Sequence, residues 1–203
     1  MSVPDAFQHD RFLVDQLIRP IANLYRITPL AAGETPLGGP VAFVRQKKMA
    51  IKEDIRFFAD ESESQELFRL KARSILDTGG SRYDVTDESG TQIGMLHHVL
   101  RQSLFRSTWK INDAAGSEIA TAQERSLPMA IARRLIDFVP YGEWVPIPYN
   151  FDLLDDGRVI GSLNRKFQLR DRYILDLGGD HERKLDRRLA IALAIGLDAL
   201  QNR

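Results

Sequence analysis

The stretch KLDRRLAIALAIGLDALQ, residues 184–201, decides the fold, because it predicts a helix that is apolar around its whole circumference. Alanine and glycine alternate with the larger side chains and keep this helix slim. A helix that is apolar on every side must be buried on every side. We therefore expect it to run through a closed β-barrel as the core of the molecule. The large aliphatic residues are Leu189, Ile191, Leu193, Ile195, Leu197 and Leu200.

Three related stretches upstream of the helix predict β-hairpins. They are YDVTDESGTQIG from Tyr83, WKINDAAGSEIA from Trp109 and FDLLDDGRVIG from Phe151. Each begins with alternating aromatic and apolar residues, which favour strands, and continues into an acidic turn that ends in glycine. The acids lack the alternate spacing of a calcium-binding loop, so they indicate turns and not a metal site. The third stretch is one residue shorter, which predicts a different type of turn.

Further short strands predict an all-β barrel or sandwich of about ten strands. One helix is expected among them, at residues 126–139, where Ser126 is a plausible N-cap and Pro128 is tolerated in the first turn. The other predicted strands span residues 41–49, 54–58, 66–73 and 171–177.

The N-terminal segment predicts a separate unit. Apolar residues within 10–28 approximate one helical face that Pro20 interrupts, and residues 29–40 form a Pro- and Gly-rich linker. The expected organisation is a helical segment with its linker at 1–40, followed by a barrel domain at 41–203 with its central helix at 184–201.

Composition excludes several classes of function. The chain of 203 residues has 28 basic and 28 acidic side chains, and this balance argues against a nucleic-acid-binding protein. It has no cysteine, so it has no disulfide, thiolate metal site or cysteine nucleophile. We see neither a secretory signal nor an apolar run of the roughly 20 residues that a bilayer span needs. These features predict a cytoplasmic protein.

A series of motifs, taken in order, resembles the tubby C-terminal-like superfamily, and within it the LURP-one-related and phospholipid scramblase-like proteins. The resemblance implies a closed antiparallel barrel of roughly twelve strands around one helix, without enzyme activity. Tubby-like domains are associated with phosphoinositide binding and scramblases with calcium-linked lipid movement, although the chain lacks a scramblase's Pro-rich tail and cysteine cluster. The motifs are RQKK (45–48), FFADESESQELFRLKAR (57–73), YDVTDESGTQIG (83–94), FRSTWKI (105–111) and LRDRYILDL (169–177).

The strand at 66–73 supplies the candidate site for anionic lipid head groups. Its alternation predicts that Arg69, Lys71 and Arg73 share one face, opposite to an apolar face, and present three cations over about 13 Å. The alternative is a solvated face whose charges are balanced by neighbouring acids. The basic residues that would extend the site are Arg45, Lys47 and Lys48, and the balancing acids are Asp60, Glu61, Glu63 and Glu66.

Two further basic groups could bind anions, but each has an alternative role that needs no ligand. The first lies near the end of the barrel, where solvation and local ion pairing with Asp171 are the expected roles. The second opens the last helix, where cations oppose the helix dipole and need nearby acids or a bound anion. The residues are Arg165, Lys166, Arg170 and Arg172 in the first group, and Arg183, Lys184, Arg187 and Arg188 in the second.

No cofactor or metal is expected. His97 and His98 are adjacent on a predicted strand and point to opposite faces, so they do not share a metal ion. No catalytic motif occurs. The hypotheses are therefore a lipid-binding module at an anionic membrane surface, a protein-interaction adaptor that uses the 126–139 or N-terminal helix, and a small-ligand-binding protein.

Overall fold

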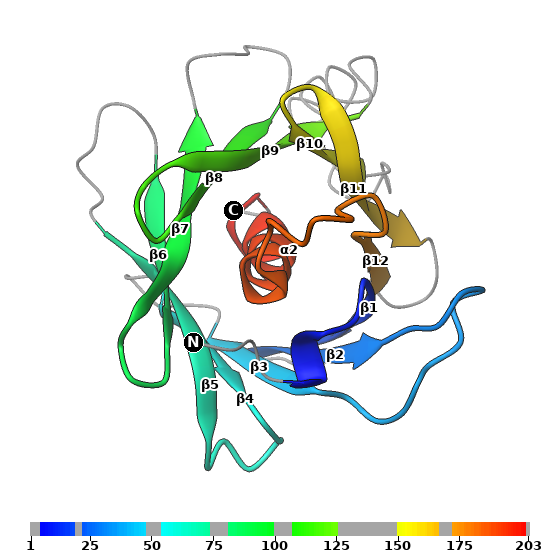
Figure 1. Cartoon of the computed structure of the whole chain (residues 1–203). Helices are drawn as coiled ribbons and strands as arrows, with labels where there is room; N and C mark the ends of the chain where they lie inside the picture. The colour runs from blue at the N-terminus through cyan, green and yellow to red at the C-terminus, as the bar shows by residue number, and fades with distance from the viewer. Residues whose placement is uncertain are drawn as a thin grey trace, which may run out of the picture.

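In the part of the chain that the structure describes, twelve strands form a closed antiparallel β-barrel around one α-helix (Figure 1). The computed structural model describes residues 5–18, 22–47, 54–73, 81–99, 107–125, 150–166 and 172–201. The prediction of a barrel with a C-terminal helix as its core is confirmed. The strands are β1 (Arg11–Ile18), β2 (Ala22–Pro29), β3 (Ala42–Lys47), β4 (Asp54–Phe58), β5 (Glu66–Ala72), β6 (Arg82–Asp87), β7 (Gln92–Val99), β8 (Thr108–Asp113), β9 (Glu118–Glu124), β10 (Asn150–Asp155), β11 (Arg158–Lys166) and β12 (Arg172–Asp176).

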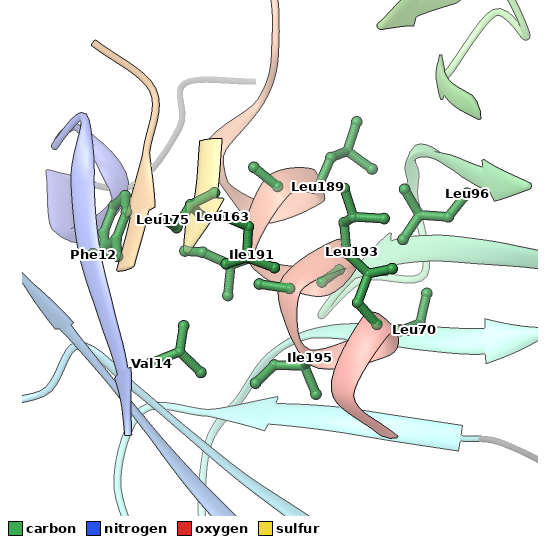
Figure 2. Packing of buried hydrophobic residues seen from close by; sticks show 14 of the residues in the cluster. Phe12, Val14, Leu70, Leu96, Leu163, Leu175, Leu189, Ile191, Leu193 and Ile195 are labelled. Atoms are coloured by element: carbon green, nitrogen blue, oxygen red, sulfur yellow. The ribbon is translucent and has the colours of Figure 1, made fainter. Parts of the chain in front are cut away.

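Helix α2 (Arg187–Gln201) occupies the centre of the ring of strands (Figure 1). Ile191 and Ile195 are fully buried, and they belong to a continuous buried run over residues 189–197. Ile191 lies on the side of β1, β11 and β12, whereas Leu193 lies toward β7 (Figure 2). The helix therefore contacts the barrel wall on opposite sides, as its sequence requires.

The predicted N-terminal helix is wrong, because its residues form β1 and β2 of the barrel. Phe12 and Val14 alternate toward the core with the period of two that defines a strand. Leu13 and Leu17 on the opposite face are also apolar, and these additional apolar residues produced the apparent helical spacing. Strand β1 pairs with β12 and closes the barrel, which therefore begins at Arg11 and not at residue 41.

The three predicted hairpins are confirmed as β6–β7, β8–β9 and β10–β11. In the first turn, Asp87 Oδ1 accepts hydrogen bonds from the backbone N–H groups of Ser89 (3.0 Å) and Thr91 (2.9 Å). The third turn differs, as expected, because Asp156 and Gly157 both have positive φ, at 47° and 80°. Acids and glycines thus serve turn geometry at these positions.

The described connections all lie at the end of the barrel where α2 begins. The connections at the other end, including the predicted helix at 126–139, lie outside the described residues. At the described end, the short 3-10 helix η1 (Asp5–Phe7) places Phe7 edge-on to Phe68, with ring centroids 5.7 Å apart. The candidate surfaces among the described residues therefore lie on the barrel wall and at this end.

Candidate functional site

The outer face of β5 carries the predicted cations. Phe68 and Leu70 are buried inside the barrel, whereas Arg69, Lys71 and Arg73 lie on the outside. The predicted alternation is confirmed. Because each side chain of a strand is fixed to one face by the pleat, the three cations share a surface.

Acidic neighbours hold two of these cations. Arg69 Nε donates to Glu66 Oε1 (2.9 Å), and this hydrogen bond, with the nearby charge of Asp54, raises the pKa of the Arg69 guanidinium. Arg73 Nε lies 2.7 Å from Asp84 Oδ2, and the hydrogen bond to Asp84 raises the pKa of Arg73. Both arginines are therefore partly neutralised in place.

Lys71 differs from its two neighbours. It is exposed and has no ion pair among the described side chains, although the strand register places it between Asp54 of β4 and Asp84 of β6. Those two carboxylates bind Arg69 and Arg73 instead. Lys71 is consequently the cation of β5 that is best placed to meet an external anion.

The predicted extension through β3 is only partly described. Arg45 is exposed on the outer face, and its Nε lies 2.7 Å from Glu63 Oε1 in the turn between β4 and β5. Lys48 and the side chain of Lys47 lie outside the described residues. Strand β4 separates β3 from β5, so Arg45 does not adjoin Lys71 directly.

The four acids that were expected to balance the cations of β5 mostly have other partners. Glu66 does bind Arg69, but Glu63 binds Arg45 and Glu61 binds Arg26. Asp60 Oδ1 accepts the backbone N–H of Ser62 (2.7 Å), and hydrogen bonds from the hydroxyl and backbone of Ser62 lower the pKa of this carboxyl group. Sequence neighbours are therefore a poor guide to charge balance on a barrel wall, where cross-strand partners decide it.

A row of basic residues crosses four successive strands, and sequence analysis missed it. Arg73 N donates to Arg82 O (2.9 Å), Arg82 pairs in register with His97, and His97 pairs with Lys110. Strands lie about 4.8 Å apart, so the row extends over roughly 14 Å. We call Arg73, Arg82, His97 and Lys110 the basic row. Strand alternation places each of these residues on the outside, but only the register brings them into line.

The two other basic groups are held by acids. Lys166 Nζ lies 2.7 Å from Glu34 Oε1, and Arg172 Nε lies 3.1 Å from Asp15 Oδ1. Arg170 lies outside the described residues. Ion pairing does occur in this group, but with acids that are distant in sequence, and Asp171, the neighbour expected to pair, lies outside the described residues.

Acids likewise offset the cations that open α2. Arg187, which is 2% exposed, donates to Asp180 and to Asp10, at 2.5 Å each. Asp186 caps the helix, because its Oδ1 accepts the backbone N–H of Arg188 (2.8 Å). The negative charge needed near these cations is thus supplied by the chain itself.

A pocket on the outer wall lies where β1, β2 and β3 meet the turn between β4 and β5. It encloses about 330 Å³, including space open to solvent. Leu17, Leu24, Phe43 and Phe58 give it an apolar floor. Its rim carries two ion pairs, Arg26–Glu61 and Arg45–Glu63. We call this site, with the lining residues Leu17, Leu24, Tyr25, Arg26, Phe43, Val44, Arg45, Phe58, Glu61 and Glu63, the wall pocket.

The histidines point to opposite faces, as predicted. His97 belongs to the outer basic row, whereas the ring of His98 stacks on Trp109 inside the barrel, with centroids 4.7 Å apart. Burial, with a smaller effect of His97, lowers the pKa of His98. Within the described ranges, no group of three or more histidine or acidic side chains is arranged to hold a metal ion.

The fold and these surfaces define a tubby-like binding domain, in which a barrel wall surrounds a helical core. The LURP-one-related family model matches residues 41–198, and the chain belongs to this family. The family has a tubby-like binding fold and is not a known family of enzymes. A search of curated proteins finds no match. Among the described helices, none is long and apolar enough to cross a membrane.

Proposed function

We propose that the chain is a peripheral membrane-binding module whose outer strands contact anionic phospholipid or phosphoinositide head groups. The observation that supports this proposal is the position of Lys71 beside the basic row on the wall formed by β5 to β8. Lys71, Arg73, Arg82 and Lys110 are cations on adjacent strands, and they can approach a negatively charged surface together. The membrane in question is the anionic cytoplasmic leaflet.

The charges of this surface do not contribute equally. A cation near an anionic leaflet contributes about 1 kcal/mol. Arg73 and Lys110 already bind Asp84 and Glu118, so a head group must compete with these acids. Lys71 has no such competitor in the described structure, and its contribution should be the largest.

Liposome co-sedimentation tests the proposal. Replacing Lys71 and Lys110 by serine should weaken binding to anionic vesicles by between about fivefold and thirtyfold at low ionic strength, from about 1 kcal/mol for Lys71 and less for Lys110, for which Glu118 competes. The matched control replaces Arg158 and Lys166 by serine, which removes the same charge from β11 elsewhere on the wall. Equal pelleting of the two double variants would refute the assignment of the surface.

Repeating the co-sedimentation at different salt concentrations, with different head groups and with or without calcium identifies the kind of binding. Electrostatic binding should weaken as salt shortens the Debye length, whereas apolar docking should persist. Vesicles that contain phosphoinositide are compared with vesicles of equal charge that contain phosphatidylserine, each with and without calcium. Binding that does not depend on vesicle charge would contradict the proposal.

One of the two helices that the protein-interaction hypothesis proposed as a binding surface does not form. The segment expected as an N-terminal helix forms β1 and β2 in the barrel wall, so it offers no helix to a partner. The predicted helix at 126–139 lies outside the described residues. Head-group binding therefore has the more specific structural support.

A further inference from the structure

We infer that the wall pocket binds an amphiphilic carboxylate with a short alkyl chain. The site lies on β1 to β4, away from the basic row on β5 to β8, and Arg45 is the one lining residue that was also a candidate for head-group binding. Its two halves are an apolar floor and a rim of guanidinium groups. Together they match a ligand that has one apolar end and one anionic end.

The strand register places the arginines of the rim directly beside the apolar side chains of the floor. Leu17 pairs with Leu24, and Leu24 pairs with Arg45. In the neighbouring row, Arg26 pairs with Phe43, and Phe43 pairs with Phe58. Directly opposed side chains on a sheet have Cβ atoms about 5 Å apart. Each guanidinium stem therefore stands next to an apolar residue, so a single small ligand can reach both.

The chain's own glutamates show that the rim accepts carboxylates. Arg26 Nε (2.8 Å) and Nη2 (2.6 Å) both donate to Glu61 Oε1, and Arg45 Nε lies 2.7 Å from Glu63 Oε1. Guanidinium keeps its charge at all ordinary pH values, and its planar fork matches a carboxylate. A ligand carboxylate would take the place of a glutamate in a contact that the structure already contains.

These glutamates are weak competitors for the arginines. The side chains of Glu61 and Arg45 are 59% and 50% exposed, and exposed ion pairs stabilise little because water screens them. Release of a glutamate from its arginine therefore costs little.

The size of the pocket limits the apolar part of the ligand. The wall pocket measures about 330 Å³ with open solvent space included, so the space that side chains enclose is smaller than this. A ligand is therefore limited to one short alkyl chain that lies along the apolar floor and stays partly exposed to solvent. We choose octanoate as the probe, with octanol and octylammonium as controls for the charge.

Isothermal titration of the full chain without vesicles tests the inference. Octanoate should bind more tightly than octanol or octylammonium. Across shorter carboxylates, each methylene that the floor buries should change the affinity about fourfold, which corresponds to about 0.8 kcal/mol. Absence of octanoate binding at millimolar concentration, or tighter binding of octylammonium, would overturn the inference.

Two double variants should change the affinity for octanoate in opposite directions. Arg26→Gln with Arg45→Gln should weaken octanoate binding at least about tenfold, because the charged hydrogen bonds are lost. Glu61→Gln with Glu63→Gln should strengthen it two- to threefold, because the competing carboxylates are gone, at roughly the strength of exposed ion pairs. Lys71→Ser should leave it unchanged. The proposed contact would be contradicted if the Glu61→Gln, Glu63→Gln variant bound octanoate more weakly than the wild type. It would also be contradicted if the Arg26→Gln, Arg45→Gln variant bound octanoate as tightly as the wild type.

Discussion

Replacement of Ile191 by alanine tests how much the enclosed helix contributes to stability. Ile191 is fully buried in α2 and lies on the side of Phe12, Leu163 and Leu175 (Figure 2). The change removes three carbon atoms from the core, equivalent to about 2.4 kcal/mol at about 0.8 kcal/mol each. The cavity left behind adds to this cost, so we expect the free energy of unfolding to fall by about 3–4 kcal/mol.

Urea denaturation followed by circular dichroism measures this loss. At about 2–4 °C per kcal/mol for a chain of this size, the melting temperature should fall by roughly 6–16 °C. Val159→Ala is the control, because Val159 is 55% exposed, and it should change stability by at most about 0.5 kcal/mol. A loss below about 1 kcal/mol for Ile191→Ala, with the same denaturant slope, would refute complete enclosure of the helix.

Two further predictions concern the wall that faces the helix. Gly94→Ala should destabilise the protein by at least about 2 kcal/mol in the same assay, because an added Cβ would lie 2.4 Å from Asn112 O and 2.7 Å from Leu189 Cδ1; a neutral effect would contradict this close approach. His98→Phe should flatten the pH dependence of the melting temperature, because the folded pKa of His98 is lowered. The wild type should therefore lose stability as pH falls below the unfolded pKa of about 6.5. Phenylalanine keeps an aromatic ring against Trp109 but has no group that titrates. An equal dependence of the melting temperature on pH in both proteins would count against the burial of His98.

The sequence predicted the elements whose environment is fixed by local pattern. Continuous apolar character identified α2, and acid–glycine turns identified three hairpins. The same approach failed at β1, because Leu13 and Leu17 are apolar although they lie on the outer face. A period of two cannot be recognised when both faces of a strand carry apolar residues.

The candidate surfaces were less predictable because they depend on register. Alternation along β5 correctly placed Lys71 outside, since that requires only one strand. The basic row and the wall pocket are each built by several strands, and a shift of one residue in any pairing would disperse them. Charge balance has the same origin: Arg26 binds Glu61, which is 35 residues away in sequence.

The enclosure of α2 is tested most directly by thiol labelling. The chain has no cysteine, so a single Leu193→Cys variant carries one reporter at a position that is 1% exposed. Under native conditions we expect this thiol to react with a maleimide only at the rate of unfolding, and to react at once in urea, whereas Val159→Cys should react immediately in both. Rapid native labelling at position 193 would contradict a barrel that is filled by its own C-terminal helix.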